Sequence, residues 1–386
     1  MIPHTIRTVA LGVLLAGCGG SVPSSMPGAA WPGIGEEALL AFSAGRDLFH
    51  RAFTPETGLG PTFNETRCSS CHDVPTLGGA GVERVQKGTR FENGRCDLLH
   101  HEGGEVFQQS TTPLLEAKGV VAEPISRRAT ALVQIVPPQL YALGALAAIA
   151  DKEILSRADP EDLDEDGISG RAGVTVDGRL ARFGRKATVA TIREFAEIAF
   201  LREMGLTTRK FPQEDNVGGQ PPPAGTDPAQ DPEIDDATVD QIVRFIELLA
   251  FPVPAAPPAA RDSIARGKRA FQRIGCSDCH TPTMRTQANP IGAISRKKLP
   301  LYSDLLLHDM GPGLATICAP AAEPSEWRTT PLYGLRLRMQ YMHDGRVQTI
   351  ESAIRLHAGE AESSRALFET LSPGEQANLL RFLLSL

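Results

Sequence analysis

The pentad Cys276-Ser277-Asp278-Cys279-His280 decides how the rest of the chain is interpreted. Two residues between the cysteines let one turn of backbone present both thiols to neighbouring haem vinyl groups, and the histidine that follows can take the iron. A second copy, Cys68-Ser69-Ser70-Cys71-His72, stands in the first half of the chain. A redox-active C-x-x-C does not need the trailing histidine, and a zinc site would need closely paired partner ligands. The sequence therefore predicts two covalently bound haem c groups, attached through Cys68, Cys71, Cys276 and Cys279, with His72 and His280 on the irons.

The N-terminus has the pattern of an exported lipoprotein. Arg7 is followed by an apolar stretch over residues 8–15, which is too short to cross a bilayer, and then by Leu15-Ala16-Gly17-Cys18. That run resembles the bacterial lipobox, in which the cysteine is lipidated and becomes the mature N-terminus. An ordinary signal peptide with an incidental Cys18 is the alternative. Residues 19–35, rich in Gly, Ser, Pro and Ala, predict a flexible tether.

Export and haem attachment agree with each other, because bacteria attach c-type haem outside the cytoplasm. We therefore expect a lipid-anchored protein of the bacterial cell envelope that faces the periplasm, on the outer membrane in preference to the inner one. Cys96 and Cys318 remain after the pentads and Cys18 are assigned. An oxidising compartment favours pairing them, but their spacing does not establish that they lie within reach, so both states stay open.

Composition narrows the class of protein further. The formal net charge is −7, which leaves no basic footprint for DNA or RNA. The chain of 386 residues contains 30 Pro and 37 Gly, which predicts many loops. Aromatic residues make up only 5%, and porphyrins would supply part of the apolar core that such side chains otherwise fill.

Similar helical patterns open and close each half of the chain. Residues 36–49 and 261–274 have helical apolar spacing and lead into the pentads, while 238–249 and 375–386 read as amphipathic closing helices. A Pro-rich linker lies over 251–260. The sequence thus predicts a mostly α, loop-rich fold with two cytochrome c-like haem domains, at 36–250 and 261–386, the first carrying an insertion.

An internal match distinguishes the two halves. The runs 128–132 and 328–332 align at an offset of 200, as do Ile154 and Ile354, which indicates diverged copies. At that offset His357 faces Arg157. A residue able to ligate iron in the second half thus has a partner in the first that cannot, and we expect two haems that are not equivalent.

The insertion in the first half is acidic, over residues 158–171. Asp162, Asp164, Asp166 and Gly167 copy the first half of a calcium loop, but the twelfth position is Gly173, where a bidentate Glu would be expected. A calcium site and a solvated acidic turn both fit this pattern.

Several runs together resemble one family. They are residues 58–72, 164–170, 182–187, 327–335 and 343–346. The family is the bacterial di-haem oxidoreductases, also described as thiol oxidoreductases, which are similar to the di-haem cytochrome c peroxidases and to the MauG enzymes that oxidise a partner protein. The resemblance covers nearly everything from residue 36 to 386, and it implies haem more firmly than any substrate.

The resemblance also implies axial ligands. Di-haem peroxidases follow an H-D-G run, here 343–345, with an acidic helix and a Met that ligates the C-terminal haem; this sequence has His357 at that place. Bis-His ligation would give a lower potential than His/Met, whereas a surface histidine is the alternative. His308 and Met310 are further candidate ligands or loop residues.

For the N-terminal haem no matching ligand or catalytic residue is found, because the peroxidases' Gln and Glu motif is absent. His100 and His101 are the nearest free imidazoles, and Glu102 and Gln108 could supply acid or hydrogen-bonding groups. A pair of loop histidines without a role is the alternative for His100 and His101, and the catalytic residues stay unknown.

Two arginines and one tryptophan complete the candidate site residues. Arg328 and Arg346 could pair with haem propionates in a fork that Lys cannot reproduce, or could form ordinary salt bridges. Trp327 could relay electrons between haems or simply pack.

These expectations combine into a di-haem c-type oxidoreductase, peroxidase-like in activity. Electrons from a donor protein or small redox carrier would enter at the C-terminal haem and react with substrate at the N-terminal one. The alternative is an electron-transfer cytochrome without a substrate of its own.

Overall fold

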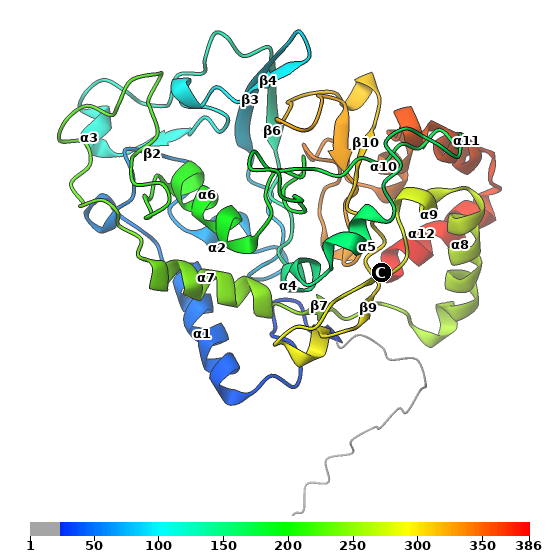
Figure 1. Ribbon diagram of the computed structural model, residues 1–386. Coiled ribbons are helices and arrows are strands. Elements are labelled where there is room, and N and C mark those ends of the chain that lie inside the picture. The colour runs from blue at the N-terminus through cyan, green and yellow to red at the C-terminus, as the bar shows by residue number, and fades with distance from the viewer. Residues whose placement is uncertain (1–23) are drawn as a thin grey trace, which may run out of the picture.

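Figure 1 presents the computed structural model of the protein, which describes residues 24–386. The predicted signal peptide with Cys18 lies outside the described residues. Helices hold about a third of the chain, and loops with five small sheets of two or three strands make up the rest of the described part. The prediction of a loop-rich fold is therefore confirmed, while helix is less abundant than the expected mostly α fold. Over residues 24–386 we find no helix that combines the length and the apolar character needed to span a membrane.

Two long helices frame the first pentad. α1 (Glu36–His50) packs against α7 (Asp236–Leu248), and α6 (Ile192–Met204) packs on α7 in turn. Thr191 and Asp235 cap α6 and α7 by accepting hydrogen bonds from backbone N–H groups of the first turn. Gly45 lets α1 and α7 approach closely, because a Cβ there would collide with the carbonyl oxygen of Gln241.

The second pentad has the same frame. α8 (Arg261–Arg273) packs against α12 (Pro373–Ser385), and a Cβ at Gly267 would collide with the carbonyl oxygen of Asn378. Ser372 and Glu375 form a capping box at the start of α12, with Pro373 at the first position. The four predicted opening and closing helices are therefore confirmed to within two residues at each end. Shorter helices complete this side, namely α9 (Cys276–Cys279), α10 (Ile350–Arg355) and α11 (Glu362–Thr370).

The remaining elements are short. Four two-stranded pairings are β1 (Ser24–Ser25) with β7 (Phe251–Pro252), β2 (Thr62–Phe63) with β5 (Ser110–Thr111), β8 (Met284–Arg285) with β9 (Lys298–Leu299), and β10 (Leu307–Asp309) with β11 (Glu326–Arg328). The one three-stranded sheet described has the order β4 (Arg95–Asp97), β3 (Val85–Glu92), β6 (Ala131–Ile135). The helices α2 (Cys68–Cys71), α3 (Pro113–Glu116), α4 (Leu143–Ala147) and α5 (Asp151–Leu155) lie between them.

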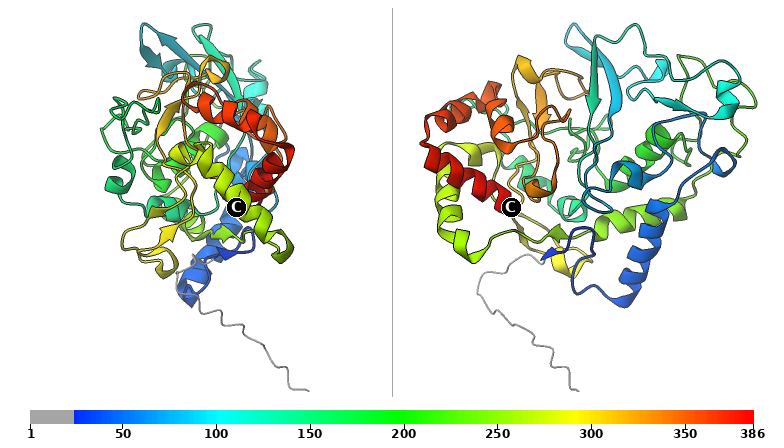
Figure 2. Two further views of the ribbon diagram at one scale, coloured as in Figure 1. Left: turned by 90° about the vertical axis from the view of Figure 1, so that its right-hand side faces the viewer. Right: turned by 180° about the vertical axis from the view of Figure 1, so that it is seen from behind.

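The halves share their core. Seen from behind in Figure 2, α8 and α12 lie on one side and α1 with α7 on the other, with strands between them. The largest hydrophobic cluster takes residues from both sides of the predicted 251–260 linker, including Phe245, Met284 and Tyr333. Cys96 and Cys318 form a disulfide across the halves, with their Cα atoms 5.8 Å apart. The predicted domain boundary stays a prediction, since packing and a covalent bond both cross it.

The chain before α1 is packed rather than free. β1 pairs in parallel with β7, and Trp31 is 1% exposed and donates from its indole N–H to the carbonyl of Glu247 at 3.1 Å. A buried indole contributes a large apolar area, which holds this segment on the fold. The tether predicted over 19–35 is therefore wrong for residues 24–35.

Candidate haem sites

The second pentad opens on a cavity of about 240 Å³. Gly275, with φ of 81°, ends α8 and starts α9, so that Cys276, Cys279 and His280 all line this cavity. Phe271 of α8 lines it too. The walls are otherwise mainly apolar, which suits a porphyrin.

Three histidines are oriented alike by backbone carbonyls. The Nδ1 atoms lie 3.2 Å from Gly79 O for His72, 2.9 Å from Tyr302 O for His280, and 2.8 Å from Ala353 O for His357. A carbonyl only accepts, so Nδ1 carries the hydrogen and the lone pair of Nε2 is left free to bind iron. Burial lowers the pKa of His72 and of His280 to about 4, and it lowers that of His357. All three imidazoles are thus neutral at neutral pH, as ligation requires.

His357 lines the same cavity as His280, just beyond the end of α10. Thr349 caps α10 by accepting from the backbone N–H of Ser352, which fixes where the helix delivers this side chain. The structure therefore brings together the two imidazoles that the sequence assigned to the C-terminal iron.

His308 is excluded as a ligand by its own hydrogen bonds. Its Nε2 lies 2.8 Å from Asp304 and its Nδ1 lies 2.7 Å from Glu360. Burial opposes the charge, but hydrogen bonds with the two carboxylates outweigh it and raise the pKa of His308 to about 12. An imidazolium with both nitrogens occupied has no lone pair for iron.

Three half-buried arginines line the cavity, and the described residues supply no counter-ion to them. In the part of the chain that the structure describes, no carboxylate lies within 4.0 Å of the guanidinium of Arg185, Arg328 or Arg338. Their hydrogen bonds go to backbone carbonyls instead, and the Nε atoms of Arg185 and Arg338 are buried without a partner among residues 24–386. Burial and the neighbouring guanidiniums lower the pKa of Arg185 to about 9 and that of Arg328, next to Arg338, to about 10.

This arrangement fits a haem, whose two propionates would supply the missing negative charge. Arg328, the propionate partner that the sequence proposed, lines the cavity. Arg346 is not, because it is exposed and its Nε bonds Asp344 at 2.6 Å. The sequence reading missed Arg185 and Arg338, although Arg185 stands in the run 182–187 that resembles the family.

Another part of the cavity wall is an aromatic stack. The rings of Trp327 and His343 lie 3.9 Å apart at an angle of 13°, and the ammonium of Lys186 lies 3.9 Å from the centre of the indole on Trp327. Burial lowers the pKa of His343 to about 4, and its Nε2 is buried without a hydrogen-bond partner among the described residues.

The first pentad has different surroundings. Burial raises the pKa of the Cys71 thiol, and the carboxylates of Glu203, Glu65 and Glu83 raise it further. Asn64 donates to Glu203 at 2.7 Å, and burial raises the pKa of Glu203 to about 7. The charged groups near Cys71 are therefore carboxylates, whereas those near the second pentad are arginines.

The other candidates for the first haem lie elsewhere. His100 and His101 are exposed on a short 3₁₀ turn (His100–Glu102), and the carboxylate of Glu102 accepts hydrogen bonds from Ser126 and Arg128. Gln108 is 1% exposed, accepts from Thr62 at 3.2 Å, and leaves its Nε2 without a partner among the described residues. None of the four lines the cavity of the second pentad.

A thin wall separates the two sites. Gly79 O holds the ring of His72, while Ala80 and Gly81 line the cavity of the second pentad. Gly81 donates to Pro137 O at 3.3 Å, and residues 136–139 line the same cavity. A side chain at Gly81 would collide with the carbonyl of Cys71, so the glycine permits this close approach.

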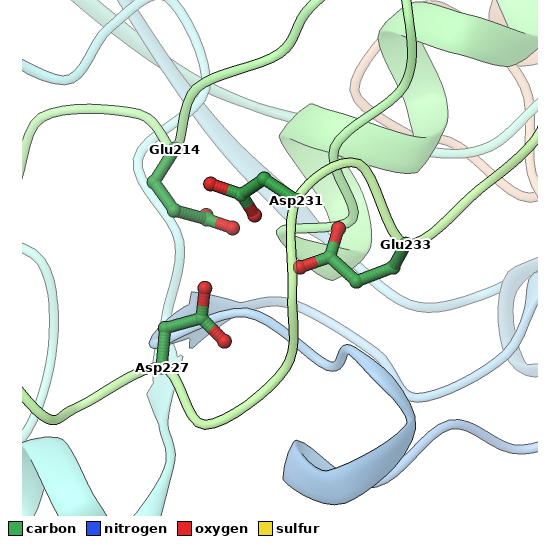
Figure 3. Close-up of side chains that lie close together, drawn as sticks. All are labelled: Glu214, Asp227, Asp231 and Glu233. Atoms are coloured by element: carbon green, nitrogen blue, oxygen red, sulfur yellow. The ribbon is translucent and has the colours of Figure 1, made fainter.

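Two acidic clusters lie outside the cavity. Carboxylate oxygens of Asp159, Asp162 and Asp164 lie within 4.8 Å of one another, while Asp166 instead accepts from Ile168 N. The sequence thus predicted two of the three members and missed Asp159. Figure 3 shows the second cluster, in which the side chains of Glu214, Asp227, Asp231 and Glu233 converge.

Comparisons with known proteins place these sites in context. A family model described as "Di-haem oxidoreductase, putative peroxidase" matches residues 132–386. A search of the curated proteins found no match. Among solved structures, hydrazine synthase from Kuenenia stuttgartiensis is similar at 13% identity, covering 100% of this chain and 99% of its own, with a TM-score of 0.40.

Two further solved structures are similar. A MauG-like protein associated with microbial copper homeostasis shares 17% identity over 64% of this chain and 89% of its own, with a TM-score of 0.33. The dihaem peroxidase BthA from Burkholderia thailandensis shares 11% identity over 89% of this chain and 85% of its own, with a TM-score of 0.39.

Proposed function

The chain belongs to the di-haem oxidoreductase family, and from that premise we propose that it is a peroxidase-like oxidoreductase with one haem c attached at each pentad. The single observation that carries the proposal is the cavity at the second pentad, which His280 and His357 line with oriented, free Nε2 atoms. Two imidazoles at one iron would leave no position for a substrate. The second pentad is therefore the site of electron entry, and the first is where substrate reacts.

Each group of the chain has a separate task in this scheme. The haems, when bound, supply one-electron redox chemistry. His280, His357 and His72 bind through Nε2, since carbonyls hold their Nδ1 hydrogens. Arg185, Arg328 and Arg338, which are half-buried in the cavity wall, would pair with the propionates. Glu203, with its pKa near 7, can hold or release a proton beside the first pentad.

The test uses the haem-loaded protein. The oxidised form should give one low-spin EPR signal from the second pentad and one high-spin signal from the first. The reduced form should be reoxidised by hydrogen peroxide, which takes two electrons and two protons to give two waters. Two low-spin signals and no reaction with peroxide would instead favour the alternative, an electron carrier that passes electrons between proteins or small redox partners.

We also propose a location at the cell envelope, lipid-anchored through Cys18 and facing the periplasm. The disulfide between Cys96 and Cys318 supports an oxidising compartment. Cys18→Ser should abolish labelling by a fatty-acid probe and release the protein from the outer-membrane fraction. Unchanged retention would argue against the anchor.

We further propose that the acidic insertion binds calcium through Asp159, Asp162 and Asp164. Oxygen donors of this kind suit a hard cation. EGTA should lower the melting temperature by a few degrees in the wild type and in Asp166→Asn, a matched acidic neighbour outside the group. Asp159→Asn with Asp164→Asn should remove that response, and an EGTA effect that persists in this variant would contradict the site.

A further inference from the structure

The stack of Lys186, Trp327 and His343 places an amine that can carry a positive charge on an oxidisable ring in the cavity wall. The ammonium of Lys186 lies 3.9 Å from the centre of the indole, and the side chain is 5% exposed. It donates to the carbonyls of Glu323, Pro324 and Glu326 at 2.9, 2.9 and 2.6 Å. Three acceptors match the three N–H groups of an ammonium, so the group is held in place over the ring. Burial lowers the pKa of Lys186 to about 7, so the group is charged at pH 6 and loses its charge as the pH rises through about 7.

A cation on the face of an indole stabilises the neutral ring and opposes its oxidation. The neutral π system attracts the ammonium, whereas a radical cation would be repelled by it. Burial strengthens both effects, because the contact lies outside bulk water. Lys186 therefore raises the cost of removing an electron from Trp327.

The indole also has no base to take its proton. Trp327 donates its Nε1 hydrogen to the backbone carbonyl of Leu314 at 3.0 Å, and a peptide oxygen is a poor proton acceptor. His343 is stacked face to face with the ring at 13°, so its nitrogens do not meet that hydrogen. An oxidised Trp327 could not relieve its charge by losing a proton.

We propose that Lys186 holds Trp327 in its reduced form, so that this wall blocks electron holes rather than relaying them. The inference rests on the proposed function only for its setting, a cavity whose haem would pass electrons to the site at which oxidising equivalents arise. Lys186 is a positioning residue that acts through the ring. The step that it prevents is loss of one electron from Trp327 to an oxidised haem, with the proton left on Nε1.

The experiment compares Lys186→Gln, which donates hydrogen bonds without charge, with Lys186→Arg, which keeps the charge. Each haem-loaded protein is treated at pH 6 with hydrogen peroxide, and oxidised tryptophan is quantified by peptide mass spectrometry. Trp31, 1% exposed and the other tryptophan of the chain, is the internal reference. We expect Trp327 to be oxidised about tenfold faster in Lys186→Gln than in wild type, and Lys186→Arg to remain near wild type.

A second oxidant separates this inference from the proposed function. Photogenerated tris(bipyridine)ruthenium(III) accepts one electron and needs no reaction of peroxide with haem. The same ranking of the three proteins with ruthenium(III) would support the inference even if peroxide were not consumed. Equal oxidation of Trp327 in all three would overturn it, as would faster oxidation in wild type. Lys186→Met is the second neutral variant if Lys186→Gln fails to hold two haems.

Discussion

The two pentads share a covalent motif and differ in almost everything around it. The second opens on a cavity with three arginines that no described carboxylate compensates and with His357, whereas the carboxylates of Glu65, Glu83 and Glu203 raise the pKa of Cys71 at the first. Positive charge favours the iron state of lower charge, and negative charge favours the ferric state. The comparison teaches that two C-x-x-C-H runs of one chain can have opposite electrostatic surroundings, so that in the proposed function the neighbours of each run would determine what its haem does.

The largest effect should come from removing one attachment. Cys276→Ala with Cys279→Ala should leave one haem of two bound after acid-acetone extraction, because no thioether can form at the second pentad. The matched pair Cys68→Ala with Cys71→Ala should lose the other haem. Haem counts by pyridine haemochrome and intact mass check both. Two retained haems in either variant would end the assignment of that pentad.

The next effect concerns the ligand that only the second site is predicted to have. His357→Ala should convert its low-spin EPR signal to high-spin and leave the signal of the first site unchanged. His357→Met should restore low spin at a higher potential, since a thioether favours ferrous iron. His343→Ala, a histidine of the same cavity that stacks on Trp327, is the control and should keep the low-spin signal. A wild-type spectrum in His357→Ala would show that another group is the second axial ligand of this iron.

The disulfide tests whether the two regions unfold as one. Cys96→Ser with Cys318→Ser opens a loop closed over a sequence separation of 222 residues. The chain-entropy model gives a loss of up to about 5 kcal/mol in the free energy of unfolding. Urea titrations followed at the absorbance of each haem should show the two transitions separating. Coincident transitions at the wild-type midpoint would mean that packing alone joins the halves.

A smaller effect should distinguish the sites by pH. Burial raises the pKa of Glu203 to about 7, so its carboxyl is neutral below that pH and anionic above it. The potential of the first haem should therefore fall as pH rises through about 7, while that of the second stays constant. Spectroelectrochemistry of Glu203→Gln should show the fall removed. The same shift implies that the free energy of unfolding decreases as the pH rises from about 4.5 to about 7, because the folded state holds the proton of Glu203 more tightly than the unfolded state does.

Short-range sequence patterns predicted the helices that surround both sites. Apolar spacing and the Ser372–Glu375 capping box determine helix ends through contacts a few residues apart, and these predictions are confirmed. The position of His357 in the cavity followed from the family resemblance. The predicted match between the two diverged copies holds only in part, because Leu132 is 50% exposed in β6 whereas Leu332 lines the cavity.

What the sequence missed depends on neighbours distant in the chain. Arg346 resembles Arg185 in type, but Asp344 compensates it, while Arg185 meets only carbonyls and other cations. His308 is excluded as a ligand by Glu360, which lies 52 residues away in sequence. Trp31 docks on α7 although its flanking residues resemble a linker. The spacing of apolar residues along the chain does not predict such contacts between distant segments.

The wall between the sites has a consequence for cooperativity. The carbonyl of Gly79 tunes the basicity of His72, and the same turn continues into Ala80 and Gly81, which face the other haem cavity. A small shift of this turn, caused by electron arrival at the second haem, would change the bond to Nδ1 of His72 and hence the affinity of the first iron for an electron. Linkage requires the reverse effect to be of equal size. The two irons should therefore titrate as a coupled pair, each reporting the charge of the other.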